Sequence, residues 1–352
     1  MRDIGILTFL HNGNYGSTLQ AYALQRTLRE MGLDCEHIDY RPSRAEKVRN
    51  LLSSGNSPRL VLEGMRKRSV TQEQAGDREK RAAINRFYEK RMALSPVCAD
   101  HAALRALNDR YARFVCGSDQ IWNPVWLNPA YFLDFAARDR TRVAYAASLG
   151  VQELPAAGKG AKIARLTEPF AAISLREEEG AALMLRMTGR TCPVMPDPVC
   201  LLSAGQWLAL AEEAEEPAEL RPGSMLCYLL GSRPGYAEEV ARIAKETGLS
   251  PCVIPVTAED FRSGLPLLNG LSPEGFLRAL SGAALLVTDS FHGLVMATLL
   301  KVPVRLLRRD REDDPERKNS RLDHFQRLMR TETPETLRAR GRAWLEEALK
   351  KA

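Results

Sequence analysis

Two parts of the sequence show the same alternation of short apolar runs and amphipathic helical patterns, and this alternation constrains the fold most. In the first part an apolar run at 4–10 leads into a Gly- and Asn-containing loop, a helical pattern and a second predicted strand, CEHIDY, at 35–40. Strand, loop, helix and strand in this order form the unit of a parallel α/β sheet. The pattern begins again near 224, after an extended segment with three prolines at 191–199.

The length of the chain agrees with two copies of such a unit. Its 352 residues are about twice the roughly 150 of a typical domain. We therefore predict an α/β protein with two Rossmann-like domains that face a cleft. The N-terminal domain is expected to cover 1–190, and the C-terminal domain, with the last helices of the chain, is expected to cover 191–352.

The segment 43–110 departs from the alternation. It is charged and poor in β-branched residues, which predicts a helical insertion in the N-terminal domain. From Arg41 to Arg91, 14 Lys and Arg stand against 6 Asp and Glu, although the net charge of the whole chain is only +6. Nucleic-acid-binding surfaces usually combine basic residues with interleaved aromatics or a known motif. Neither is present, so we expect no nucleic-acid partner.

The composition also restricts the class of protein. Hydrophobic residues make up 45% of the chain, but no apolar run approaches the roughly 20 residues that span a bilayer. The N-terminal sequence MRDIGILTFL has neither a basic region nor a cleavage site of a secretory signal, so we expect a cytoplasmic location. The seven cysteines form no CxxC pair, which indicates reduced thiols in the core.

The clearest candidate site lies at 288–304, where TDSFHGLVMATLLKVPV reads as a buried strand that turns into a helix. Ser290 or Asp289 can cap this helix, and its free N–H groups then point out of the sheet, where they attract anions. His292 falls in the first turn, and Gly293 allows a ligand or a backbone to approach closely. We interpret His292 as a functional residue, with an ordinary contact at a helix start as the alternative.

A second candidate is Arg176, which follows the predicted strand AAISL at the start of another helix. The glutamates at 177–179 suit a helix N-terminus, whereas a cation there is mildly unfavourable unless an anion joins it. A guanidinium can hold a carboxylate or a phosphate through two parallel hydrogen bonds. The pattern therefore indicates an anion beside Arg176.

Two loops after predicted strands carry polar residues. In VCGSDQIWNP, Asp119, Gln120 and Asn123 suit sugar hydroxyls and Trp122 suits a sugar ring, with a structural turn as the equal alternative. The loop HNGNYGS at 11–17 is of the kind that approaches ligands, but it does not match GxGxxG, which argues against a dinucleotide. The five histidines are far apart in sequence, so no metal site is predicted.

Taken together, these segments resemble the polysaccharide pyruvyl transferase family. The matching motifs follow the family order between residues 4 and 325: GILTF, HNGNYGSTLQAYALQ, GSDQIWN, ISLREEE, PDPVCLL, YLLG, LLVTDSFHG and KNSRLDHF. GSDQIWN and TDSFHG are the specific ones, whereas YLLG and PDP alone are weak. The segment 43–110 matches none of the motifs.

The resemblance implies a GT-B-like architecture, with the acceptor on the N-terminal domain and phosphoenolpyruvate on the C-terminal domain. It implies transfer of the pyruvyl group of phosphoenolpyruvate onto two hydroxyls of a saccharide, giving a cyclic ketal, in cell-surface or exopolysaccharide biosynthesis. Phosphoenolpyruvate is an activated co-substrate, so neither a cofactor nor a metal is expected. The match makes Arg176 and His292 catalytic and assigns substrate binding to Asn14, Gly16, Ser118, Asp119, Gln120, Trp122, Asn123, Ser290, Gly293, Lys318, Asn319 and Arg321.

The basic segment at 41–91 suggests a further partner. Acceptors in this family are often saccharides on a lipid carrier, and a basic helical surface can hold a protein near the anionic headgroups of the inner membrane face. A solvated helical insertion explains the same charges equally well.

Two other functions fit the same architecture. In many nucleotide-sugar-dependent GT-B glycosyltransferases a glutamate seven residues before a proline binds the ribose hydroxyls. Counted from Pro303, that position is Met296, whose side chain cannot accept those hydrogen bonds. The other alternative is a non-catalytic binding protein, against which the presence of both Arg176 and His292 argues.

The assignment of the two catalytic residues can be tested directly. We expect that Arg176→Ala and His292→Ala each abolish turnover and leave the chain folded. Phosphate release from phosphoenolpyruvate and circular dichroism would measure the two properties, and near-normal activity of either variant would contradict the assignment.

Overall fold

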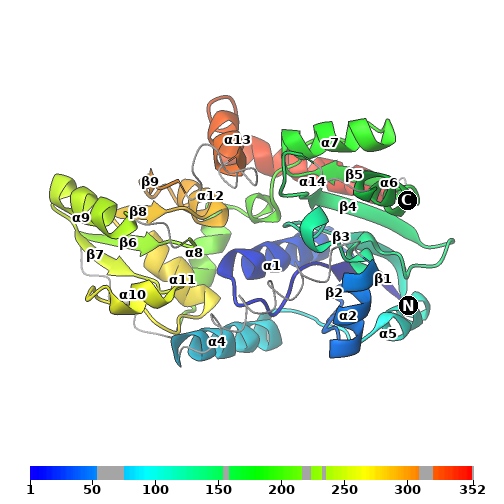
Figure 1. Cartoon of the computed structure of the whole chain (residues 1–352), viewed down its shortest axis with the longest axis horizontal. Helices are drawn as coiled ribbons and strands as arrows, with labels where there is room; N and C mark the ends of the chain where they lie inside the picture. The colour runs from blue at the N-terminus through cyan, green and yellow to red at the C-terminus, as the bar shows by residue number, and fades with distance from the viewer. Residues whose placement is uncertain (54–74, 154–157, 216–222, 232–234, 309–319, 351–352) are drawn as a thin grey trace.

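The N-terminal part of the chain forms a five-stranded parallel sheet in the order β2-β1-β3-β4-β5 (Figure 1). The computed structural model describes residues 1–53, 75–153, 158–215, 223–231, 235–308 and 320–350. The strands of this first sheet are β1 (Arg2–Leu7), β2 (Cys35–His37), β3 (Tyr111–Cys116), β4 (Thr141–Ala147) and β5 (Ala172–Leu175). They are largely buried, as expected for a parallel sheet whose two faces are covered.

Helices surround this sheet and include the inserted segment. The described helices and 3-10 turns of this part are α1 (Tyr15–Glu30), α2 (Arg44–Ser53), α4 (Ala75–Arg91), α5 (His101–Ala106), η1 (Leu107–Asp109), η2 (Pro124–Trp126), η3 (Pro129–Phe132), α6 (Lys159–Thr167) and α7 (Glu178–Thr188). The described parts of 43–110 are thus mainly helical, as predicted, and 54–74 lies outside the described residues. Helix α4 is more than a solvated insertion, because Phe87 packs in one core with Trp207 of the C-terminal part.

The C-terminal part contains a four-stranded parallel sheet in the order β7-β6-β8-β9. Its strands are β6 (Ser224–Tyr228), β7 (Ser250–Val253), β8 (Leu285–Thr288) and β9 (Val304–Leu306). The helical elements after the proline-containing segment are η4 (Pro198–Leu201), α8 (Ala204–Glu212), α9 (Tyr236–Thr247), α10 (Ala258–Arg262), α11 (Pro273–Ser281), α12 (Phe291–Leu299), α13 (Ser320–Leu328) and α14 (Pro334–Lys350). The predicted fold class, two Rossmann-like α/β units in a GT-B-like arrangement, is confirmed.

One helix lies elsewhere than the sequence pattern indicated. The last helix, α14, was expected with the C-terminal domain. Instead its apolar residues Leu345 and Leu349 share a core with Ile4 of the first sheet. The end of the chain therefore returns to the N-terminal unit.

The strand orders show where ligands are expected to bind. In each sheet the chain reverses direction across the sheet between two central strands, β1 and β3 in the first and β6 and β8 in the second. Open α/β sheets bind ligands beyond the carboxyl ends of the strands at such a switch point. The two switch points face each other, because Gly16 after β1 lies against the His292 imidazole after β8.

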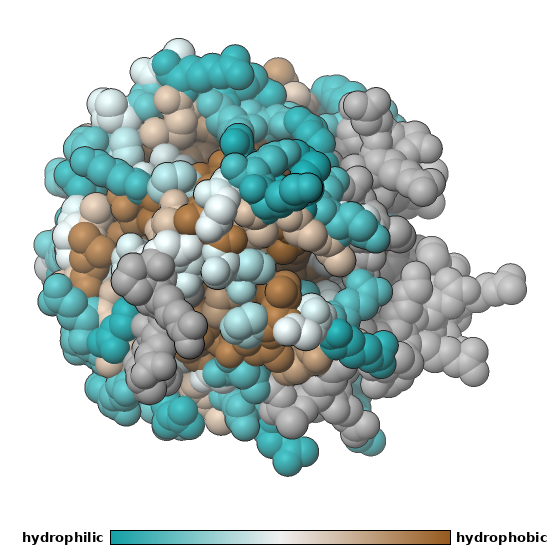
Figure 2. Space-filling view, turned by 90° about the vertical axis from the view of Figure 1, so that its left-hand side faces the viewer, coloured by the Kyte–Doolittle hydropathy of each residue, from teal (hydrophilic) through white to brown (hydrophobic). Residues whose placement is uncertain are grey.

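The surface is of mixed polarity. Seen from the end that carries α9 and α10, hydrophilic residues surround scattered hydrophobic ones (Figure 2). None of the described helices combines the length and the apolar character that a membrane crossing requires.

Candidate active site

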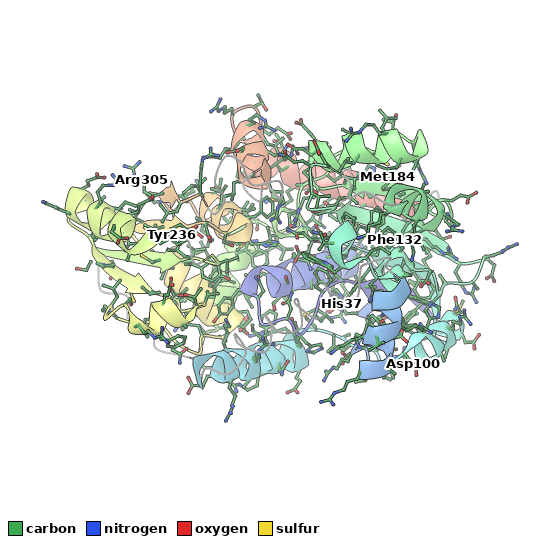
Figure 3. All side chains as sticks on the ribbon, viewed as in Figure 1. His37, Asp100, Phe132, Met184, Tyr236 and Arg305 are labelled. Atoms are coloured by element: carbon green, nitrogen blue, oxygen red, sulfur yellow. The ribbon has the colours of Figure 1, made fainter. Side chains whose placement is uncertain are left out.

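The turn between β8 and α12 positions His292. Ser290 is the N-cap of α12, and its hydroxyl accepts a hydrogen bond from the Gly293 N–H at 3.2 Å. The neighbouring Asp289 accepts instead from the N–H groups of Leu230 and Gly231, and from the hydroxyl of Tyr236. Tyr236 is labelled in Figure 3. Ser290 is buried, so it shapes the turn that presents the imidazole.

Two glycines allow this turn and its contact with the N-terminal unit: Gly293 in the turn itself and Gly16 at the start of α1. A Cβ on Gly293 would lie 2.9 Å from Thr288 Oγ1, so this glycine makes the turn compact. A Cβ on Gly16 would lie 2.3 Å from His292 Nδ1. The N-terminus of α1, capped by the Asn14 side chain, therefore touches the imidazole directly. His292 belongs to one unit and packs on the other.

Asp197 joins His292 to Arg176. One oxygen, Oδ2, lies 3.3 Å from His292 Nε2 and accepts a hydrogen bond from Arg176 Nη1 at 2.9 Å. The other oxygen, Oδ1, accepts from the Val199 N–H. Burial alone raises the pKa of Asp197, but the charges of His292 and Arg176 lower it well below its usual range. Asp197 is therefore a buried carboxylate at neutral pH.

Sequence reasoning assigned no role to Asp197. Its motif, PDPVCLL, was among the family matches but was too short to be specific. The available signal was an aspartate between two prolines in a segment that crosses between domains. Its partners are 21 and 95 residues away in sequence, so only the tertiary structure shows the contact.

Arg176 is surrounded by carboxylates of the protein. Besides Asp197, its guanidinium lies 3.5 Å from Glu177 and 3.7 Å from Asp119. Its Cζ atom lies 4.7 Å from the centre of the Phe291 ring, and the side chain is 2% exposed. The predicted anion beside Arg176 is therefore supplied by the protein itself. Only its Nη2 lacks a hydrogen-bond partner among the described residues.

The loop after β3 brings Asp119 and Gln120 to the same place. Ser17 donates its hydroxyl hydrogen to Asp119 at 2.6 Å. With its amide oxygen turned towards α13, Gln120 accepts from both terminal nitrogens of Arg321 at 2.5 and 2.7 Å. Ser118 is buried and donates to the Ala146 carbonyl. The loop thus connects the N-terminal unit to α13.

The predictions for Trp122 and Asn123 are wrong. Trp122 is fully buried and stacks on Phe132, labelled in Figure 3, with ring centres 4.9 Å apart, so its ring is unavailable to a sugar. Asn123 is buried and caps η2 by accepting from the Val125 N–H. Lys318 and Asn319 lie outside the described residues.

The cluster is negatively charged. Asp119, Glu177 and Asp197 face one guanidinium and one imidazole, so the net charge is negative whether or not His292 is protonated. Such a site stabilises positive charge that develops nearby. Within the described ranges, no three His, Cys, Asp or Glu residues form a group that could hold a metal ion.

The sequence profile of the family described as polysaccharide pyruvyl transferase matches residues 14–311. The chain belongs to this family. Members are transferases, so the cluster lies in a pyruvyl transferase fold. Among curated proteins, none has a sequence that matches this member.

Solved structures of similar fold include UDP-GlcNAc 2-epimerases. The UDP-GlcNAc 2-epimerase of Neisseria meningitidis, bound to UDP-GlcNAc, is 12% identical to this family member, with a TM-score of 0.54 over 100% of both chains. The UDP-N-acetylglucosamine 2-epimerase of Rickettsia bellii is 7% identical, with a TM-score of 0.52 over 99% of this chain and 96% of its own. At these identities the likeness concerns the fold.

The contact between Gly16 and His292 gives a first prediction. A methyl group at position 16 must displace the imidazole, and a misplacement of about 1 Å in an active site costs on the order of 100-fold in rate. We expect Gly16→Ala to lower kcat/KM of this family member to that extent. Gly205→Ala is the matched control, because a Cβ there meets only Ser203 Oγ, at 3.9 Å. Equal activity of the two variants would show that catalysis does not require the His292 imidazole at its observed position.

The carboxylate cluster adds a stability cost to the expectation that Arg176→Ala leaves the chain folded. Removing the guanidinium leaves buried carboxylates unpaired, which we expect to lower the free energy of unfolding by about 3–5 kcal/mol at neutral pH. The pKa of Asp197 is lowered in the folded state, so its stabilising contribution is present at neutral pH and is lost on acidification. Urea denaturation at several pH values should show a deficit that shrinks towards acid pH. A deficit independent of pH would exclude this origin.

Proposed function

We propose that this protein transfers the pyruvyl group of phosphoenolpyruvate to two hydroxyls of one saccharide, with release of phosphate and formation of a cyclic ketal. The observation that carries the proposal is the chain of contacts from Arg176 through Asp197 to His292, placed where the switch points of both sheets meet. Family membership supports pyruvyl transfer, and the contacts supply the groups that this chemistry needs.

The reaction needs a proton donor and a site for positive charge. Protonation of C3 of the enol makes C2 an oxocarbenium-like centre, to which the first hydroxyl adds. The bond between C2 and the phosphate oxygen then breaks, and the second hydroxyl adds to C2 and closes the ketal ring. One hydroxyl proton replaces the proton given to C3, and the other leaves with phosphate.

We assign the proton donor to His292. Asp197 lies next to Nε2 and orients the ring, as a carboxylate does for the histidine of a catalytic triad. The net negative cluster around it also stabilises positive charge at C2. With its side chain 12% exposed, His292 reaches the surface of the site.

Arg176 then acts as a positioning residue. Its guanidinium is buried and holds Asp197, and through Asp197 it fixes the place of the imidazole. Within this guanidinium, Nη2 is the nitrogen left to bind the donor directly, because it lacks a hydrogen-bond partner among the described residues. We propose Arg321, which meets Gln120 across the interface, as the residue that holds the donor phosphate.

The saccharide acceptor is expected beside the loops of the N-terminal unit, where Asn14, Asp119 and Gln120 lie. A lipid-linked acceptor, with membrane contact through the basic segment 41–91, stays a prediction, since 54–74 lies outside the described residues. Transfer from a nucleotide sugar is the less favoured candidate. The fold resembles epimerases that act on UDP-GlcNAc, but Met296, at the position where a ribose-binding glutamate would stand, is fully buried in the core.

Incubation with phosphoenolpyruvate and a panel of glycosides tests this proposal. We expect inorganic phosphate to be released only with a suitable acceptor, and mass spectrometry to show one pyruvate-derived ketal per product. His292→Gln keeps the shape of the side chain and removes the titratable proton, so it should abolish both signals. UDP-GlcNAc offered as the donor should give no product. Sugar transfer from UDP-GlcNAc, without any phosphate release from phosphoenolpyruvate, would favour the glycosyltransferase instead.

A further inference from the structure

His292 shares the accessible side of the charged cluster with one other ionisable group. The side chains of Asp119 and His292 are 13% and 12% exposed, whereas those of Arg176, Glu177 and Asp197 are at most 5% exposed. The cluster therefore has a buried layer, in which a guanidinium holds two carboxylates, and an accessible layer made of one carboxylate and one imidazole. A carboxylate and an imidazole that reach the surface together are the side chains used for proton transfer.

The backbone holds Asp119 in a fixed orientation. Its φ is 65°, in the left-handed region that non-glycine residues seldom adopt and that aspartate and asparagine tolerate best. The Gln120 N–H donates to Oδ1 at 2.8 Å, and the Ser17 hydroxyl donates to Oδ2 at 2.6 Å. Ser17 is itself held by Asn12, whose amide donates to its oxygen. Each carboxylate oxygen keeps a lone pair for a hydroxyl of a substrate.

The surroundings keep Asp119 ionised. Burial raises its pKa, but Arg176, His292 and the hydrogen bond from Ser17 together lower the pKa below its ordinary value. The other two carboxylates of the cluster are engaged differently. Asp197 binds Arg176 and His292, and Glu177 accepts the hydroxyl hydrogen of Ser148 at 2.7 Å. Asp119 is thus the carboxylate of the cluster that an acceptor can reach.

We propose that Asp119 is the general base of the reaction and works as a pair with His292. The inference rests on the function proposed above. As the first hydroxyl bonds to C2, its proton passes to Asp119 while His292 protonates C3. Asp119 then returns its proton to the departing phosphate oxygen, and His292 takes the proton of the second hydroxyl as the ketal closes. Both groups end in their starting forms, and every proton is accounted for.

The substitution Asp119→Asn tests this role. The amide keeps the size of the side chain, can still accept from Ser17, and suits the left-handed backbone, but it cannot take a proton. We expect kcat/KM to fall by about 10²- to 10⁴-fold, the usual contribution of general acid–base catalysis. Affinity for phosphoenolpyruvate should not weaken, because a negative charge has been removed. A thermal unfolding curve confirms that the variant is folded.

Two readouts separate a base from a purely structural partner of Arg176. Acceptors whose hydroxyl is made more acidic by a neighbouring fluorine need less help from a base, so they should recover part of the activity of Asp119→Asn. The acidic limb of the pH profile of kcat/KM should also become less steep in this variant, because Asp197 then titrates there without Asp119. Glu177→Gln is the matched control, since it also removes a carboxylate beside Arg176 but one that is buried. It should keep the slope of the acidic limb and gain nothing from fluorinated acceptors.

The parental protein is assayed in parallel with both variants. If it turns over and Asp119→Asn stays within about threefold of it, or responds to fluorinated acceptors no more than Glu177→Gln does, Asp119 is not the base and the pyruvyl transfer stands. If the parental protein itself releases no phosphate from phosphoenolpyruvate with any acceptor, both the proposed function and the base role of Asp119 are wrong.

Discussion

The buried ion pair between Arg176 and Asp197 is the interaction on which the rest of the site depends. A charged group that is removed from water must be paired, because its desolvation costs on the order of several kcal/mol per ion. Arg176 follows the last strand of the first sheet, and Asp197 lies in the segment that leads to the second unit, so the pair fixes that crossing to the sheet edge. The oxygen of Asp197 that binds the guanidinium also faces His292. One carboxylate therefore sets the position of an imidazole that belongs to the other unit.

Much of this arrangement could be predicted from the sequence, and the reason is the geometry of parallel sheets. Once strands alternate with helices, the carboxyl ends of the strands of each sheet lie along one edge. Residues that follow strands, such as Arg176 in the first sheet and His292 in the second, are therefore expected on the ligand-binding side of their units without any knowledge of side-chain contacts. The sequence could not show which groups pair there. Periodicity places Trp122 in a loop after a strand but does not say on which side of the loop it packs, and the structure buries it against Phe132. Asp197 was missed for the same reason, because its partners are remote in sequence.

The sequence also did not show which helices join the two units. An apolar stripe indicates that a helix is buried but not against which surface, so α14 gave no sign that it packs on the first sheet. Helix α4, in the inserted segment, shares a core with the C-terminal unit. Together with the proline-containing crossing, these elements connect the units on several sides. Because Asp119 and Gly16 belong to one unit and His292 to the other, any movement of the units relative to each other changes the distance between the proposed acid and the proposed base.

The sign of the charge in the cluster bears on how such a site can work. The proposed donor, phosphoenolpyruvate, is an anion, and a cluster with more carboxylates than cations does not attract it. In the proposed reaction, cations outside the cluster, such as Arg321, supply the ground-state affinity. The same negative charge becomes favourable when C3 is protonated and C2 develops positive charge. An interaction that is stronger in the transition state than in the ground state accelerates the reaction, whereas one that is equal in both only tightens binding. In the proposed reaction, the buried arginine thus acts on the rate through the negative potential of the two carboxylates that it keeps ionised, Asp119 and Asp197, rather than as a clamp on the donor.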